Sequence, residues 1–402
     1  MLHLRDRAIG WPGGTMNLRR WAVLGLVLPV VLGGCKNFWK LPSGSSGSTG
    51  TTLSSGVFYV LDQTADQLVA YDISSGVLNK IGTYSVAGPT AMALSPSGSY
   101  LYVSTLISGI YAYSVGSGGA LTELNGNAAI SSDPALALAV DTTNSWLIDA
   151  FINAGGQVVV DATPLNASGT YTAGASVASA TFTISNSPTV KQMALSSDNA
   201  NIFLALGTGG TIIVPFSSTT PLPAGVTAHT ISVLHNEGSD LSVAVDPQTR
   251  FFYVGEANGN SAGSSGGLRY FDYSTLAEES GSPLASGGLA PSAILPMADY
   301  VYVANGQGAT SAGNVALFSI TTSGSTTSLT AGSTFASGTQ PIGLAEDSQS
   351  NFILAVSEGD DTSSGGNPDL DAYTISSGAL TSALTSATGT DPVGAIAILA
   401  LP

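Results

Sequence analysis

A chain of 402 residues is long enough for two or three ordinary domains, or for one large repeat architecture. Charged residues make up 9% of the chain, against roughly 25% in an average soluble protein, and 44% of its residues are hydrophobic, which excludes global disorder. The formal net charge of −16 repels phosphate-rich ligands and argues against nucleic-acid binding.

Residues 17–35 have the pattern of an export signal. The basic pair Arg19-Arg20 precedes an apolar run at 21–32, which is too short for a comfortable membrane span, and Gly33-Gly34-Cys35 follows. The end of this segment resembles the lipobox of bacterial lipoproteins, in which the cysteine is lipidated and becomes the mature N-terminus. The alternatives are an uncleaved anchor helix and an ordinary signal with a chance cysteine.

The resemblance implies a chain in three parts. Residues 1–34 are expected to be a leader and signal peptide that is removed, and residues 35–56 a lipidated Cys35 with a tether rich in Gly, Ser and Thr. A coil of 21 such residues has a reach of roughly 25 Å. We therefore expect an exported envelope lipoprotein that touches the membrane only through its lipid. By the sorting rules of such proteins, Lys36 favours the outer membrane.

Residues 57–402 are built from a repeated unit. Seven short apolar strands begin at a proline or its stand-in, at positions 89, 134, 188, 240, 291, 341 and 392, which are 45 to 54 residues apart. A turn and a second strand of aromatic and β-branched residues follow most of them, for example at 100–103, 252–254 and 300–303. A third strand and a weaker, polar fourth complete the unit. This spacing predicts an all-β, seven-bladed β-propeller of four-stranded blades.

The two ends of the repeat region complement each other. The first repeat begins at Val57 without an opening strand, and the chain ends with an opening strand at 393–399 that has no followers. If the last strand is the innermost strand of the first blade, the ring closes and no sheet edge stays exposed. The alternatives are stacked sandwiches or a β-solenoid, but a solenoid does not need matching incomplete ends.

The stretch Tyr302-Val303-Ala304-Asn305, with degenerate copies at Tyr59, Tyr102 and Tyr253, resembles the YVTN-repeat, lactonase-like propeller family. The resemblance covers residues 57–402 and implies the seven-bladed fold. It does not fix an activity, because the family ranges from sugar-lactone hydrolases to cell-surface proteins without known chemistry.

Polar residues at the ends of the second strands are the first candidates for a binding site. Asp62, Thr105, Glu256 and Asn305 end this strand in four repeats, and the loops that follow are expected around one mouth of the ring. Two carboxylates, a hydroxyl and an amide are suited to bind a polyol or to polarise a lactone. The alternative is that strand ends are where polar residues ordinarily occur.

A second candidate is an acidic loop. Glu358, Asp360, Asp361, Asp369 and Asp371 concentrate the hard oxygen ligands that calcium prefers, but they lack the spacing of an EF-hand. The alternative is a solvated acidic loop without a metal. No other cofactor is expected.

The third candidate is a group with catalytic potential. His229 and His235 lie near Glu237 and Asp240, and a histidine paired with a carboxylate can act as a general base. The alternative is that these histidines and carboxylates are ordinary loop residues without a catalytic role. The lactonases of the resembled family act on a phosphorylated sugar, which calls for cations, yet after the tether only Lys80, Lys191, Arg250 and Arg269 remain. Lys191 precedes an innermost strand.

The favoured function is a non-enzymatic scaffold or binding module for a glycan or protein partner at the cell surface. The scarcity of cations and the lack of a recognisable spacing among the candidate catalytic residues favour it. The alternative is a lactone hydrolase with Glu256, His235 and Lys191 among its working residues.

Overall fold

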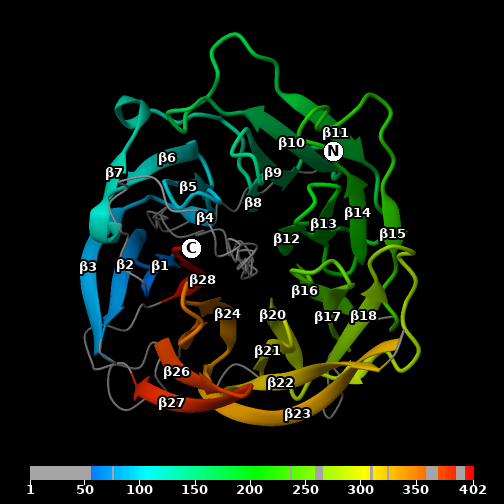
Figure 1. Ribbon diagram of the computed structural model, residues 1–402. Helices are drawn as coiled ribbons and strands as arrows, with labels where there is room; N and C mark the ends of the chain where they lie inside the picture. The colour runs from blue at the N-terminus through cyan, green and yellow to red at the C-terminus, as the bar shows by residue number, and fades with distance from the viewer. Residues whose placement is uncertain are drawn as a thin grey trace, which may run out of the picture.

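The computed structural model describes residues 56–74, 77–235, 238–258, 266–307, 311–323, 326–358, 370–385 and 394–402. The predicted signal, Cys35 and the tether up to residue 55 lie outside the described residues. Seven four-stranded antiparallel sheets surround a central axis, as Figure 1 shows, so the predicted seven-bladed β-propeller is confirmed. None of the described residues belongs to a helix with the length and hydrophobicity needed to cross a membrane.

Each blade runs from an innermost to an outermost strand, and only blade 1 joins the two ends of the chain. Blade 1 contains β28 (Ala395–Ala400), β1 (Val57–Asp62), β2 (Gln67–Ser74) and β3 (Val77–Ser85). Blade 2 contains β4 (Pro89–Leu94), β5 (Tyr100–Thr105), β6 (Gly109–Val115) and β7 (Leu121–Glu123), with short 3-10 turns η1 (Ser117–Gly119) and η2 (Asn125–Asn127) beside β7. Blade 3 contains β8 (Ala137–Val140), β9 (Trp146–Ile152), β10 (Val158–Pro164) and β11 (Ala178–Phe182).

The other four blades repeat this order. Blade 4 contains β12 (Gln192–Leu195), β13 (Asn201–Ala205), β14 (Thr211–Pro215) and β15 (His229–Ile231). Blade 5 contains β16 (Ser239–Val245), β17 (Phe251–Ala257), β18 (Gly267–Asp272) and β19 (Leu284–Ala285). Blade 6 contains β20 (Ala290–Pro296), β21 (Tyr300–Gly306), β22 (Ala312–Ser323) and β23 (Thr326–Thr339). Blade 7 contains β24 (Pro341–Glu346), β25 (Phe352–Ser357), β26 (Leu370–Ser376) and β27 (Ala379–Thr385).

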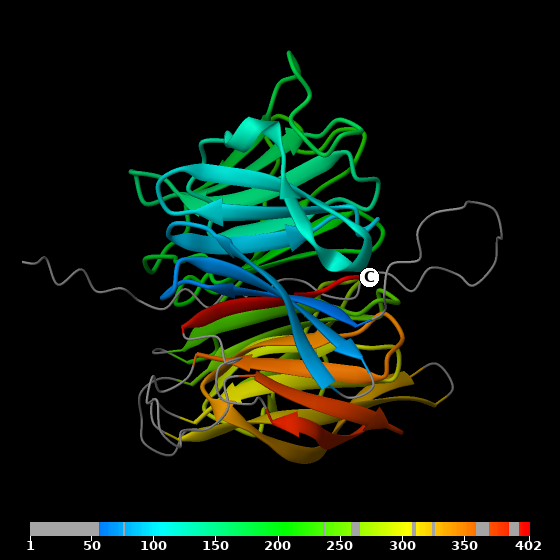
Figure 2. The same cartoon turned by 90° about the vertical axis from the view of Figure 1, so that its left-hand side faces the viewer.

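The ring is closed by pairing between the last strand and the first. β28 runs antiparallel to β1, with Phe58 opposite Ala400 and Val60 opposite Ile398, and Figure 2 shows the red strand beside the blue ones. All six residues of β28 are buried. The predicted closure is therefore confirmed, because an apolar strand at the end of the chain gains both hydrogen bonds and burial in the incomplete blade.

The second strand of each blade is apolar on both faces because adjacent blades pack against both sides of it. β1, for example, is buried at every position, and the buried side chains form six clusters around the ring. Such strands have continuous hydrophobic runs instead of strict alternation.

The tyrosines of the recognised motif join neighbouring blades. Tyr59, Tyr102 and Tyr302 are fully buried, and each donates its hydroxyl to a glycine carbonyl in the outer hairpin of the next blade: Gly119 at 2.8 Å, Gly169 at 3.0 Å and Gly378 at 2.8 Å. These glycines have positive φ, and a Cβ at Gly119 would lie 2.5 Å from Val57 Cγ1. Only glycine therefore fits the turn that receives this bond. We call this contact the tyrosine latch.

Candidate functional site

The ends of the second strands and the starts of the innermost strands form one rim of the ring, because the two strands are antiparallel. The four predicted rim residues occupy equivalent register positions, each opposite the first residues of the inner strand: Asp62 opposite Ala395, Thr105 opposite Pro89, Glu256 opposite Asp240 and Asn305 opposite Pro291. A bulge in the pairing follows at each of these positions and at Pro341 in blade 7. The four residues aligned from the sequence repeats therefore occupy the same position in their blades.

At this position the side chains are buried and organise the rim turns. The bonds are those of Asp62 with Ala65 N and Gln67 Nε2 (both 3.0 Å), of Thr105 Oγ1 with Gly109 O (3.0 Å) and Ser108 N (3.1 Å), and of Asn305 Nδ2 with Ser286 O (2.7 Å). Ligand binding by these residues stays a prediction, since the structure shows them already holding backbone turns.

Glu256 differs from the other three because it anchors a charged cluster. Its two carboxylate oxygens accept hydrogen bonds from Leu234 N at 2.9 and 3.0 Å and from His235 N at 3.2 Å. Arg269 Nη1 donates to it at 3.2 Å, and His235 Nδ1 lies 3.1 Å from it. A buried carboxylate is held in place here by one cation, one imidazole and two backbone amides.

Arg269 ties this cluster to the outer part of blade 5. Its guanidinium bonds Glu278 through two nitrogens, at 3.0 and 2.7 Å, and Ser232 O at 2.8 Å, and it lies over the ring of Phe271. Burial alone would lower the pKa of Arg269, but the hydrogen bonds and charge of Glu278 and the charges of Asp240 and Glu256 outweigh it and raise that pKa. Arg269 therefore stays positively charged, and its guanidinium is already paired with Glu256 and Glu278.

His235 presents its ring to solvent while Glu256 orients it. Its side chain is 47% exposed, whereas Glu256 is 1% exposed. With Nδ1 directed to the carboxylate, Nε2 is the nitrogen that a substrate or water can reach. The sequence had grouped His235 with Glu237 and Asp240. Glu237 lies outside the described residues, and His229 is exposed on the outer strand β15, so the partner that the structure supplies is Glu256.

Lys191 and Asp240 lie at the seam between blades 4 and 5. Asp240 exchanges two backbone hydrogen bonds with Gly207, and a Cβ on Gly207 would lie 3.5 Å from Lys191 Cε. Burial raises the pKa of Asp240 to about 7, against the opposing hydrogen bond from Thr211 at 2.7 Å. Burial also lowers the pKa of Lys191. The seam therefore gathers two titratable groups near the Glu256 cluster.

The predicted calcium loop is described only at its two ends. Asp360, Asp361 and Asp369 lie outside the described residues. Glu358 is half-buried, and Asp371 is buried, where its Oδ2 accepts hydrogen bonds from Gly338 N at 2.9 Å and Ser337 Oγ at 3.2 Å. Calcium binding by this loop stays a prediction.

A pocket of about 200 Å³ opens between blades 1 and 2, and sequence reasoning did not identify it as a whole. Its lining includes Val86 of blade 1 and, from blade 2, Thr105, Ser108, Tyr111, Tyr113 and Glu123. Burial, with the charge of Glu123 and the neighbouring Tyr111, raises the pKa of Tyr113 to about 12, so its hydroxyl stays protonated and can donate. Thr105 is the one predicted rim residue that faces this pocket.

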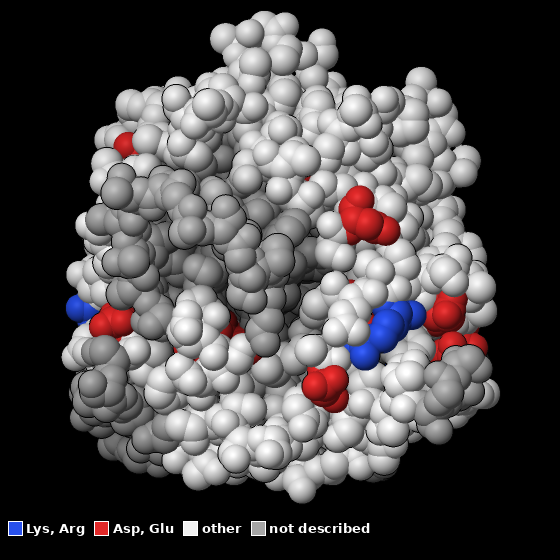
Figure 3. Space-filling view, viewed as in Figure 1, with Lys and Arg blue, Asp and Glu red and all other residues white. Residues whose placement is uncertain are grey.

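One face of the ring carries few charged side chains among the described residues. Figure 3 shows this face, on which acidic and basic side chains occur singly among residues that are neither. On this face, the described residues form no large cluster of lysines and arginines of the kind that binds phosphate or nucleic acid.

Together, the fold and the site define a seven-bladed β-propeller with polar rim turns, an oriented histidine and an interblade pocket. The structure is similar to a putative 6-phosphogluconolactonase from Bacteroides fragilis, at 16% identity and a TM-score of 0.64, covering 87% of this chain and 99% of that one. It is also similar to the periplasmic gluconolactonase of Pseudomonas aeruginosa, at 16% identity and a TM-score of 0.61, covering 87% of this chain and 100% of that one. No protein-family model and no curated protein matches the chain. At these identities the likeness shows the seven-bladed propeller fold alone.

Proposed function

We propose that the protein is a non-enzymatic binding module of the bacterial cell envelope, which holds a neutral glycan in the pocket between blades 1 and 2. The observation that carries the proposal is the lining of this pocket. It offers two tyrosine rings, the hydroxyls of Ser85, Thr105 and Ser108, and one carboxylate, and no lysine, arginine or histidine is among the described residues that line it.

These side chains match the chemistry of a sugar ring. A tyrosine face packs against the C–H groups of a pyranose, while hydroxyls and a carboxylate bond its hydroxyl groups. The carboxylate of Glu123 repels phosphate and sulfate groups, which favours neutral sugars. A volume of about 200 Å³ is below the range of roughly 300 to 1,000 Å³ for drug-sized ligands. It admits one sugar unit at the end of a chain.

The predicted lipid anchor would place this pocket at the cell envelope. A lipid on Cys35 and a coil of roughly 25 Å would hold the propeller close to the membrane yet free to reorient. The weakly charged surface of the ring supports a role at the envelope instead of at nucleic acid.

A glycan array probed with the full chain tests the proposal, followed by titration calorimetry on the sugars it retains. We expect neutral glycans to bind, and Glu123→Gln to weaken that binding about tenfold or more, because hydrogen bonds to a charged group contribute roughly 1.5 to 3 kcal/mol. Glu279→Gln, which changes a carboxylate of similar exposure in blade 5, is the control and leaves the affinity unchanged. An array without retained glycans, or equal affinity in all three proteins, overturns the assignment.

A lactone hydrolase is the second candidate, because His235 is oriented by a buried carboxylate. In that reaction His235 Nε2 takes a proton from water as the water oxygen bonds to the lactone carbonyl carbon. The ring C–O bond then breaks, and the leaving alkoxide receives the proton to give the hydroxy acid. The similar gluconolactonase fold supports this candidate, although Arg269 is already occupied by Glu256 and Glu278.

The two candidates are separated by assaying the full chain against neutral and phosphorylated lactones. Turnover that is lost in His235→Gln and kept in His229→Gln, the other exposed histidine of the described residues, establishes the hydrolase. A wild-type chain without turnover excludes it.

A further inference from the structure

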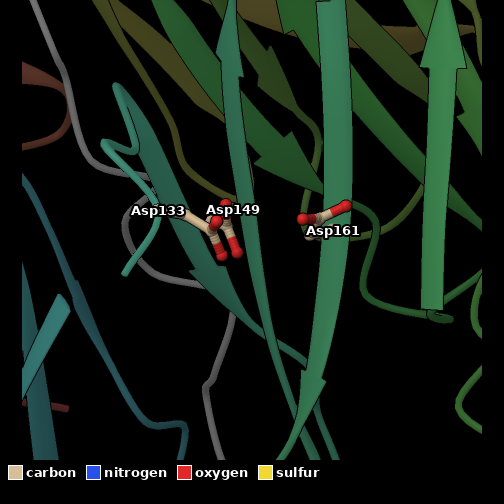
Figure 4. Close-up of side chains that lie close together, drawn as sticks. All are labelled: Asp133, Asp149 and Asp161. Atoms are coloured by element: carbon tan, nitrogen blue, oxygen red, sulfur yellow. The ribbon is translucent and has the colours of Figure 1, made fainter. Parts of the chain in front are cut away.

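Three aspartates from separate parts of blade 3 meet in the structure. Asp133 precedes β8, Asp149 lies on β9 and Asp161 lies opposite it on β10. One carboxylate oxygen from each lies within 4.8 Å of the others. Figure 4 shows the carboxyl groups of Asp133 and Asp149 side by side, with an oxygen of Asp161 turned toward them from the neighbouring strand.

Asp149 is the unusual member of this group. It is 0% exposed, and neither of its carboxylate oxygens has a hydrogen-bond partner among the described residues; Asp161 Oδ1 also lacks one. Burial, followed by the charges of Asp133 and Asp161, raises the pKa of Asp149 well above its ordinary value. A buried carboxylate without a compensating donor is costly to the fold, and this one points at two further carboxyl groups.

We propose that Asp133, Asp149 and Asp161 bind a single divalent cation of the calcium type. Oxygen ligands alone select hard cations. Calcium bonds oxygen at roughly 2.4 Å, so two of its ligands can be no more than about 4.8 Å apart, and the oxygens of all three aspartates lie within that limit. Magnesium gives up its water with difficulty and is disfavoured at a site that excludes solvent from Asp149.

The bound ion would join two blades. Residues just before Asp133 pair with blade 2, since Ser131 and Ile110 form a bridge, and Ser131 Oγ donates to Asp133. The hydroxyls of Thr90 and Ser104 in blade 2 also donate to Ala135 O, at 2.7 and 2.8 Å. The cation would therefore hold the segment that connects blade 2 to blade 3, which contains Asp133, against β9 and β10. Extracellular calcium modules typically have dissociation constants of about 10⁻⁴ to 10⁻³ M.

The test is thermal unfolding and titration calorimetry of the full chain, dialysed against EDTA, with calcium chloride or magnesium chloride. We expect one calcium per chain, and about an 11-fold shift of the folding equilibrium at ten times the dissociation constant. Asp149→Asn keeps the shape of the side chain and removes its charge. We expect it to abolish the calcium response and to raise the melting temperature of the calcium-free protein, because its amide donates to the two remaining carboxylates.

Two further variants keep the outcome decisive. Asp161→Asn alters the less buried partner and is also expected to weaken calcium binding, which covers a failure of Asp149→Asn to fold. The double variant Asp360→Asn, Asp361→Asn removes charge from the acidic loop and keeps the calcium response. The proposal is overturned if wild-type protein shows no calcium heat and no shift, or if the response survives in Asp149→Asn and Asp161→Asn and disappears in the loop variant.

Discussion

Replacing Tyr59, Tyr102 or Tyr302 by phenylalanine removes only the hydroxyl that forms the tyrosine latch. Each ring is fully buried, so the substitution leaves its packing in place and deletes one hydrogen bond to the next blade. Tyr253 offers a control within the same motif. It is equally buried, but its hydroxyl has no hydrogen-bond partner among the described residues.

The expected magnitudes follow from this difference. A latch variant loses a net bond of about 1 kcal/mol and leaves the glycine carbonyl without its donor, so we expect each to lower the free energy of unfolding by about 1 to 2 kcal/mol. Tyr253→Phe removes a buried hydroxyl that has lost its water without gaining a partner. It is expected to change stability by zero to about 1 kcal/mol in the stabilising direction.

Urea unfolding of the full chain, followed by intrinsic fluorescence, measures these changes. The slope of the transition should stay the same in all variants, because the surface exposed on unfolding is unchanged. The latches are far apart, so the losses in a Tyr59→Phe, Tyr302→Phe double variant should add. If Tyr253→Phe destabilises the protein as much as Tyr59→Phe, the latch carries no stability of its own and the reasoning is wrong.

Three other predictions concern stability and anchoring. Burial raises the pKa of Tyr59, Tyr102 and Tyr302, and raises that of Tyr113 to about 12. Above about pH 10 the folded chain therefore keeps protons that the unfolded chain releases, and the urea midpoint should fall as the pH rises further. A midpoint that stays constant between about pH 10 and 12 would contradict this. Ile398 lies in the closing strand and is 1% exposed, so Ile398→Ala should lower the free energy of unfolding by about 2 to 5 kcal/mol in the same assay. Ile375 on β26 is half-buried, and Ile375→Ala should lower it much less. Equal losses in the two variants would mean that the closing strand does not contribute more to stability than a strand elsewhere in the ring. Palmitate labelling in cells should mark the wild type and not Cys35→Ala, and an unlabelled wild type would refute the anchor.

The architecture could be predicted from the sequence because each blade is specified by a short stretch of the chain, and the same pattern of strands and turns recurs in every repeat. Each inner strand is a short apolar run that follows a turn, so seven such runs at a regular interval give the number of blades. The incomplete repeat at Val57 predicted its partner near the C-terminus, which the pairing of β28 with β1 confirmed. The motif tyrosines were recognised, but their bonds were not, because Tyr59 and its glycine partner are 60 residues apart.

The site could be predicted only as far as the register of the strands. Asp62, Thr105, Glu256 and Asn305 were correctly placed at equivalent strand ends, but sequence does not show whether a polar side chain faces a ligand or its own turn. Glu256 receives His235 from 21 residues earlier and Arg269 from 13 residues later, across two loops. The three aspartates of blade 3 were not singled out because no other acidic residue is adjacent to any of them in the sequence: Asp149 and Asp161 each stand in an apolar strand, and Asp133 follows two serines. The acidic loop at 358–371 was predicted as a calcium site because it has many aspartates and glutamates close together in the sequence. Such a run of acidic residues is as typical of a solvated loop as of a metal site.

The scarcity of cations connects these features. After the tether the chain has four lysines and arginines, which are too few to give a cation to each of the nine buried aspartates and glutamates of the described residues. Asp62 uses a backbone amide and a side-chain amide, Glu256 uses Arg269, and Asp240 uses Thr211 and a pKa near neutrality. Asp149 has no hydrogen-bond partner among the described residues. Since a buried carboxylate requires compensation, the remaining source is a proton or a metal ion. The charges of the two carboxyl groups beside it favour a proton on Asp149, but only a metal ion also uses their oxygens as ligands, which favours the metal.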